Sequence, residues 1–242
     1  MTALTEFDGI LGQRGMSSPI EWSCPGAARG RGALLAAEHR ASGQEIVRNP
    51  HLTEDWAEFA VRAPNLLAAV QAVLGPDVAV ENTFLVMKWP QRTFEIPWHQ
   101  DGIDDRLELH PERSVSAWLA ITDATVANGC LEVTPGSQSA GYLPVEKEAA
   151  TGAERGRADH AHGFTPDTTI PVPLRAGCAV LMDSRLVHRS GTNTSSGARI
   201  GLNVRYTAPG GILRRDPQSP SVVPISGTGW KSGRTRERRA PL

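Results

Sequence analysis

The chain has 242 residues and a formal net charge of −1, from 25 Lys and Arg against 26 Asp and Glu. This balance gives no field that attracts nucleic acid or an anionic membrane, so we expect a small-molecule partner. The length suits one domain spanning 1–242 with a sizeable core. The first residues carry no basic segment followed by an apolar run, and no window is long enough to cross a bilayer, which predicts a cytoplasmic protein.

The number and spacing of the cysteines exclude a disulfide framework and one kind of metal site. The three cysteines, Cys24, Cys130 and Cys178, are odd in number and widely spaced. They form neither a disulfide framework nor a C-x-x-C metal site. We expect free, buried thiols.

The N-terminal region reads as irregular structure followed by helices. Gly, Ser and Pro interrupt any period over 1–32, whereas 32–41 can form a short helix. Thr53 can cap a further helix whose first turn is acidic, which suits the positive end of the helix dipole. Trp56 and Phe59 of that helix are expected to face inward.

A stronger helical signal covers 64–74. Apolar residues recur there with the 3.6-residue period, and Gly75 supplies a stop. The periodic positions are Leu66, Leu67, Val70, Val73 and Leu74.

The pattern changes to strands after Val78. Side chains alternate between two faces over 78–88, and Pro90 ends this strand. The alternation is clearer over 114–122. Further short apolar runs are CLEVTPGS, TTIPVPL, CAVLMD, LVHRS and ARIGLNVRYTA. So many short strands between turns predict a mostly β sandwich or jelly roll over 78–209, flanked by the N-terminal helices of 1–75.

The stretch Trp98-His99-Gln100-Asp101-Gly102 offers a metal site. On a strand, His99 and Asp101 project to the same face, so one imidazole and one carboxylate can reach one ion. A second histidine from another strand, for which His188 is the candidate, would complete two histidines and one carboxylate, the arrangement of non-haem Fe(II) oxygenases. A His-x-Asp triplet alone is more often a hydrogen-bonded part of a core.

A rival cluster is His160-Ala161-His162 with Asp159. We expect it to lie in a solvated loop, with no strand to fix its geometry. The remaining histidines have no ligand-like companions and are assigned to surface or packing roles; they are His39, His51 and His110.

The run Arg199 to Arg205 points two arginines to the same face as Gly201 and Asn203, opposite an apolar face. Inside a small barrel, a basic side chain is costly unless an anion neutralises it. A dicarboxylate co-substrate would do so. A lone arginine in a strand is otherwise more often part of an ordinary ion pair.

Two polar segments have no period. The long excursion 150–168 is expected to be a lid that orders over bound substrate, or a mobile loop. The basic segment at 229–242 is expected to be a flexible tail.

Three segments together resemble the phytanoyl-CoA dioxygenase family of Fe(II)/2-oxoglutarate oxygenases, from Glu81 to Pro209. They are WHQDG, NGCLEVTPGS and LVHRSGTNTSSGARIGLNVRYT. The resemblance implies that His99, Asp101 and His188 bind iron. It also implies that Arg199, eleven residues after His188, binds the far carboxylate of 2-oxoglutarate.

The resemblance further implies a double-stranded β-helix, or cupin-like jelly roll, as the core. Ser190 would assist at the same carboxylate, while Trp118 and Phe84 would wall the co-substrate pocket. The chain departs from the family at Gln138, where a histidine often follows the P-G-S stretch. Because Asp101 is present, the chain does not resemble the related halogenases, in which a small residue leaves room for chloride.

The implied reaction uses Fe(II), 2-oxoglutarate and O2 to oxidise a C–H bond while 2-oxoglutarate is decarboxylated to succinate. Bacterial members of this size often act on secondary metabolites, including antibiotics, so hydroxylation and oxidative cyclisation, of a glycoside for example, both remain open. Candidates for substrate contact are the 150–168 segment, Trp98, Asp104, Asp105 and Arg106.

Two alternative hypotheses about the function remain. A jelly-roll module could retain a metal and bind a small molecule without turnover. Alternatively, a metal dioxygenase could work without a 2-oxo acid, and Arg199 would then be dispensable.

Overall fold

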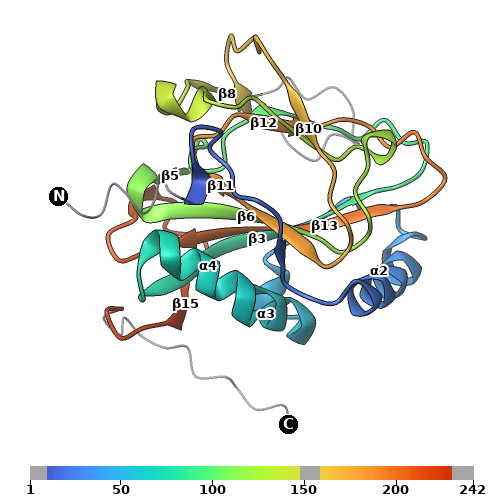
Figure 1. Ribbon diagram of the computed structural model, residues 1–242, viewed down its shortest axis with the longest axis horizontal. Coiled ribbons are helices and arrows are strands. Elements are labelled where there is room, and N and C mark those ends of the chain that lie inside the picture. The colour runs from blue at the N-terminus through green and yellow to red at the C-terminus, as the bar shows by residue number, and fades with distance from the viewer. Residues whose placement is uncertain (1–9, 148–158, 231–242) are drawn as a thin grey trace.

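Residues 10–147 and 159–230 are described by a computed structural model. Two antiparallel sheets face each other, and helices lie outside the larger one (Figure 1). The helices are α2 (Pro25–His39), α3 (Asp55–Val61) and α4 (Pro64–Leu74), with 3-10 turns at Pro50–Leu52, Pro111–Arg113, Val126–Asn128 and Ser137–Ala140. None of the described helices combines the length and apolar composition needed to cross a membrane.

The larger sheet has the strand order β1-β11-β6-β13-β3-β15, and β2 also pairs with β3. Its strands are β1 (Ile20–Glu21), β2 (Ile46–Arg48), β3 (Val78–Lys88), β6 (Ser114–Ala120), β11 (Cys178–Asp183), β13 (Arg199–Thr207) and β15 (Val223–Ser226). The facing sheet has the order β10-β7-β12-β4. It contains β4 (Ile96–His99), β7 (Leu131–Val133), β10 (Ile170–Val172) and β12 (His188–Ser190).

Two further strand pairs lie outside these sheets. They are β5 (Leu107–Leu109) with β14 (Ile212–Arg215), and β8 (Val145–Lys147) with β9 (Asp159–Ala161). The mostly β jelly roll with N-terminal helices is confirmed.

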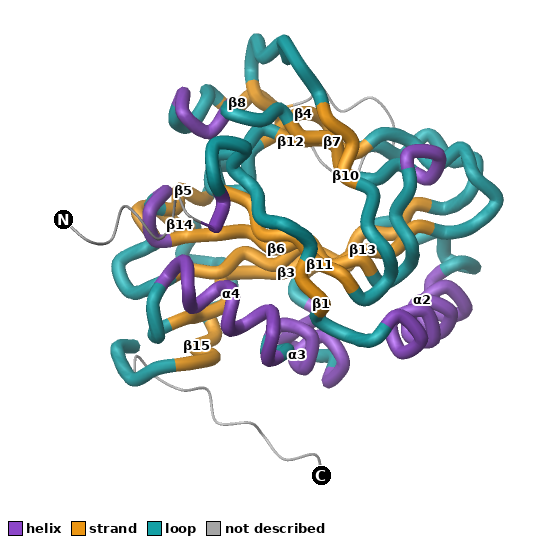
Figure 2. The backbone as a smooth tube through the Cα atoms, viewed as in Figure 1, coloured by secondary structure: helices purple, strands orange, loops and turns teal. Residues whose placement is uncertain are grey.

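The larger sheet separates an apolar layer from a polar interior. Helix α4 lies along the outer face of this sheet (Figure 2). On that face, Leu85 and Leu202 belong to the same buried cluster as Leu66 and Val70 of α4. The alternate positions of the same strands point between the two sheets and include Lys88, Phe84, Arg199 and Arg205. Strand alternation therefore supplies both the core and a charged interior.

Several local expectations are wrong. Helix α2 begins at Pro25, seven residues before the expected start, because Pro occupies its first position. Thr53 ends a 3-10 turn, so Glu54 is the residue that precedes α3. Phe59 is 66% exposed, because the buried face of α3 is formed by Ala57, Ala60 and Val61, whereas Trp56 packs partly against the core. Of the three free cysteines, Cys24 is exposed.

The segment expected to be a loop without strands contains one. Asp159–Ala161 is β9, which pairs with β8 and lies against β4. The histidine pair of this segment therefore has a fixed backbone, in contrast to the expectation. Residues 150–158 of the expected lid and 231–242 of the expected tail lie outside the described residues.

His51 makes the stability of the fold depend on pH. Its side chain is buried with Nδ1 2.8 Å from Oγ1 of Thr83. Burial lowers the pKa of His51 to about 4, against a smaller opposite effect of Glu58. Between the unfolded pKa of about 6.5 and the folded pKa, the unfolded chain binds a proton that the folded chain does not. Stability therefore falls as the pH falls through this window.

We expect the free energy of unfolding to fall less steeply with falling pH in His51→Gln than in the wild type. Urea unfolding between about pH 7 and about pH 4.5 measures it. His39→Gln, at a side chain that meets Gln44 near the surface, is the control. An unchanged pH slope in His51→Gln would show that other groups cause the acid sensitivity.

Candidate metal centre

Two facing strands bring the predicted histidines together. His99 ends β4 and His188 begins β12, and the two residues are direct partners across the antiparallel pair. Asp101 lies two residues beyond the end of β4, in a turn rather than in the strand as expected. The ligand atoms of all three side chains nevertheless lie within 4.8 Å of one another, and all three residues are buried. Among the described residues, this is the one such group of three.

Each imidazole is oriented by a backbone carbonyl. Nδ1 of His99 donates to the carbonyl of Pro97 at 2.8 Å, and Nδ1 of His188 donates to that of Leu186 at 2.9 Å. Because a carbonyl can only accept, these contacts place the proton on Nδ1 and direct Nε2 toward Asp101, 3.7 Å away in both cases. A histidine that binds metal through one nitrogen usually donates from the other in this way.

Asp101 supplies the negative charge of the site. Burial alone would raise its pKa, but His188, His99 and Arg205 outweigh it and hold the pKa well below the usual value. Oδ2 accepts a hydrogen bond from Nδ2 of Asn203 at 2.9 Å, whereas Oδ1 is buried without a hydrogen-bond partner among the described residues. An ionised carboxylate with such an oxygen beside two imidazoles fits a divalent transition metal.

Two buried cations lie side by side on the polar interior. Arg199 on β13 is the direct partner of Lys88 on β3, and each side chain is only about 1% exposed. Arg199 donates to the carbonyl of Gly129, and Lys88 donates to those of Phe94 and Ser190. No carboxylate within residues 10–147 and 159–230 forms an ion pair with either cation.

The opposite charge near this pair is weak. Burial lowers the pKa of Arg199 to about 10, against a smaller opposite effect of Cys130. Burial together with the adjacent Arg199 lowers the pKa of Lys88 to about 6, although Glu95 and Glu45 act in the opposite direction. Both shifts show that the buried positive charges are poorly compensated. A buried charge of this kind is stable only with an opposite charge nearby, so the pair fits an anionic ligand.

The three weaker sequence candidates take different places. Trp118 lies under the Arg199 guanidinium, 4.9 Å from its ring centroid, and over Gly201, where an added Cβ would come within 2.3 Å of the indole. Ser190 is buried on β12, two residues after His188. Phe84 lies farther along the polar interior and lines the cavity that is described next.

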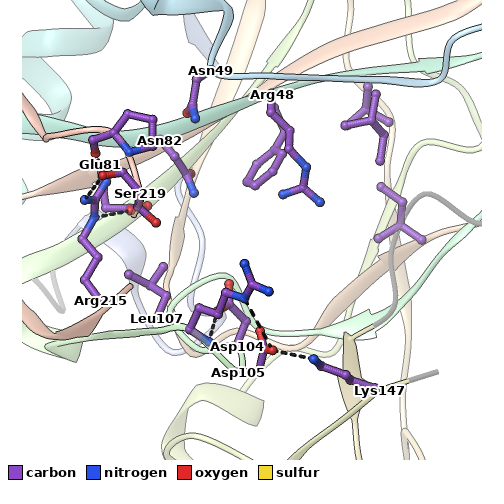
Figure 3. Close-up of a pocket in the computed structure, with 16 residues that line it drawn as sticks. Arg48, Asn49, Glu81, Asn82, Asp104, Asp105, Leu107, Lys147, Arg215 and Ser219 are labelled. Carbon is purple, nitrogen blue, oxygen red and sulfur yellow. Dashed lines mark hydrogen bonds and ion pairs between the residues drawn. The ribbon is translucent and has the colours of Figure 1, made fainter. Parts of the chain in front are cut away.

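A cavity of about 540 Å³ is lined by residues of the polar interior, although none of the three candidate metal ligands is among them. Its wall includes Arg48, Asn82, Phe84, Asp104, Asp105 and Arg106. Figure 3 shows Arg48 facing the cavity opposite Asp104 and Asp105, with Asp105 paired to Lys147 at 2.7 Å. Arg205 connects this wall to the metal centre, since it lies 3.6 Å from both Asp104 and Asp101. The predicted substrate candidates Asp104, Asp105 and Arg106 thus share one cavity.

Trp98 lies elsewhere. Its ring contacts Phe164 edge-on, with centroids 5.9 Å apart, and the Arg189 guanidinium lies 4.9 Å from its centroid. Trp98 therefore joins β4 to the segment after β9 and is not among the residues lining the large cavity. The rival His160 and His162 lie beside Glu146 of β8 and do not belong to the group of three predicted ligands, although His160 lines a small pocket together with His99.

Sequence reasoning missed several residues of the site. Lys88 was placed on a strand face without a role, and Asn203 was seen only as a companion of two arginines. The alternation of β13 already put Asn203 on the face of Arg199, but nothing in the sequence indicates that its amide meets Asp101. Arg48 carries no local signal at all, because it reaches the cavity through the pairing of β2 with β3.

A jelly roll that presents two histidines and a carboxylate at one end of a barrel interior, next to a poorly compensated buried arginine, defines a non-haem metal oxygenase. A model of the phytanoyl-CoA dioxygenase (PhyH) family matches residues 29–201. L-proline trans-4-hydroxylase of Streptomyces griseoviridis is 31% identical over 215 residues, which cover 76% of this chain and 78% of that enzyme. The chain belongs to the phytanoyl-CoA dioxygenase family and is an iron- and 2-oxoglutarate-dependent dioxygenase.

Other relatives share less of their length. The peroxisomal phytanoyl-CoA dioxygenases of Rattus norvegicus and Homo sapiens align over 43% and 53% of their chains, so this chain spans about half of those enzymes. Among solved structures, the non-heme monooxygenase ThoJ superposes with a TM-score of 0.74 at 24% identity, covering 92% of this chain and 84% of that one. SnoK, a non-heme alpha ketoglutarate dependent carbocyclase from nogalamycin biosynthesis, gives 0.66 at 21%, covering 92% and 93%. Both share the fold.

Proposed function

We propose that the chain oxidises a C–H bond of a small, polar secondary-metabolite intermediate, by hydroxylation or oxidative cyclisation. Iron is held by His99, Asp101 and His188, and the far carboxylate of 2-oxoglutarate by Arg199. The observation that carries this proposal is the buried, adjacent pair of Arg199 and Lys88, which forms no ion pair with a carboxylate among the described residues and lies on the same interior as the three ligands. A dianionic co-substrate supplies the missing charge.

The protein's own residues bind the metal and the co-substrate and orient the groups that hold them. The carbonyls of Pro97 and Leu186 fix the imidazole rings, and the Trp118 indole supports the Arg199 guanidinium from below. Burial of the ligands excludes water from the centre. Bound iron and 2-oxoglutarate supply the oxidising chemistry with O2, while 2-oxoglutarate is converted to succinate and CO2.

The cavity in the polar interior supports a polar substrate. Charged and amide side chains of Arg48, Asn82, Asp104 and Asp105 line it, with Phe84 as an apolar wall. Its volume lies within the usual range for small-molecule sites. A long acyl chain would offer these polar groups no hydrogen bonds, whereas a molecule rich in hydroxyl or carboxyl groups, such as a glycoside or an amino acid, would form hydrogen bonds with them. The names of two similar proteins, a proline hydroxylase and an antibiotic carbocyclase, point the same way.

The test begins without oxygen. Fe(II) and then 2-oxoglutarate are added to metal-free protein, and we expect the visible charge-transfer absorption that a 2-oxo acid gives with Fe(II). Oxygen is then admitted with L-proline or a panel of glycosides, and succinate is measured. Bound iron without the absorption would remove the co-substrate from the proposal and leave a 2-oxoglutarate-independent dioxygenase or a binding module. Succinate that rises with one member of the panel would identify the substrate class.

A further inference from the structure

Asn203 lies next to the predicted carboxylate ligand on the central strand of the larger sheet. On β13 it is flanked by Phe84 of β3 and Trp118 of β6, so its backbone is fixed on both sides. Its Nδ2 donates to Oδ2 of Asp101 at 2.9 Å, and the pair is buried. The amide cannot turn away without losing this bond inside the barrel.

The two oxygens of Asp101 are therefore not equivalent. Oδ2 has its hydrogen bond from Asn203, whereas Oδ1 has none among the described residues. The nearest cationic group to Oδ1 outside the histidines is Nη2 of Arg205 at 3.6 Å, which is too long for a hydrogen bond. Oδ1 is thus the oxygen left for a metal.

We infer that Asn203 is a positioning residue that holds Oδ2 of Asp101 and so limits this carboxylate to one metal-binding oxygen. The inference rests on the iron centre proposed above. With one donor atom each from His99, Asp101 and His188, a metal held here would keep room for the 2-oxo acid and for O2. If both oxygens of Asp101 bound the metal, part of that room would be taken up.

Co(II) provides a readout that does not depend on turnover. Its visible absorption depends on the number and arrangement of its ligands, so it reports on how the carboxylate binds. We expect Asn203→Ala to bind Co(II) with a visible spectrum that differs from that of the wild type. At saturating Fe(II) and 2-oxoglutarate, succinate formation should fall by at least about tenfold, the usual lower bound for loss of a group that orients a ligand.

Controls separate this role from a general loss of structure. Asn65→Ala removes a surface amide that also donates to an oxygen, the carbonyl of Glu21, and should leave the spectrum unchanged. Asn203→Ser provides a second, less disruptive variant, and thermal unfolding of the metal-free proteins reports on folding. A wild-type Co(II) spectrum in both folded Asn203 variants would overturn the inference. Absence of the 2-oxoglutarate absorption in the wild type would instead overturn the proposed function and leave the Co(II) comparison valid.

Discussion

Replacing Arg199 by glutamine is expected to raise the 2-oxoglutarate concentration that half-saturates the enzyme by about two to three orders of magnitude, since losing one partner of a buried charge pair costs about 2–5 kcal/mol. The guanidinium is only about 1% exposed, and Lys88 would remain as the single buried cation beside the carboxylate. The maximal rate at very high 2-oxoglutarate should fall much less, because Arg199 contacts none of the three metal ligands.

Titration of the Fe(II) protein with 2-oxoglutarate under anaerobic conditions measures this effect. Arg29→Gln is a matched control, because Arg29 forms an ion pair at 3.0 Å with Asp123 on the exposed surface. Equal half-saturation in Arg199→Gln and in the wild type would mean that the carboxylate binds elsewhere. It would also revive the dioxygenase that needs no 2-oxo acid.

Removal of either histidine of the metal centre is expected to reduce iron affinity and succinate formation by at least about two orders of magnitude, more than the loss of an outer partner of a ligand. In His188→Ala, His99 would be the one remaining histidine beside Asp101. His188 is the largest of the effects that lower the pKa of the Asp101 carboxyl group, so without it this pKa should rise, in the direction that burial favours. Fewer ligands and a less acidic carboxyl group both disfavour the metal.

Iron content after anaerobic gel filtration and the 2-oxoglutarate absorption check this prediction. His39→Gln serves as the control for a histidine outside the site. His162→Gln distinguishes the rival cluster, which lies on the β8–β9 pair beside Glu146. Iron retained in His188→Ala and lost in His162→Gln would move the metal centre to that cluster.

The local pattern of the sequence predicted those elements whose side chains face two different environments. The alternation over 78–88 and 199–207 gave strands with one apolar and one polar face, and the 3.6-residue period over 64–74 gave a helix. Each pattern is set by residues close in the chain, so it can be recognised without knowledge of the fold. Where apolar residues surround a short helix, as in α3, the pattern does not show which face is buried, and Phe59 was placed wrongly for that reason.

The candidate ligands could also be predicted from the sequence, for a related reason. His99 and Asp101 are two residues apart, and Arg199 follows His188 by eleven, so a fixed separation along the chain carries the motif. The spacing predicted a strand at Asp101, although this residue lies in the turn after β4. The close spacing was still informative, because two residues cannot be far apart in either conformation.

The sequence by itself therefore determined the class of fold, the candidate metal-binding motif and the arginine that faces the interior. Only the tertiary structure decided that Lys88 lies beside Arg199, that Asn203 holds one oxygen of Asp101, and that Arg48 reaches the cavity. These features join residues from different parts of the fold, separated by roughly a hundred positions in the first two cases. Their proximity depends on strand order and register, which arise from packing of the whole sheet and leave no periodic trace in the chain.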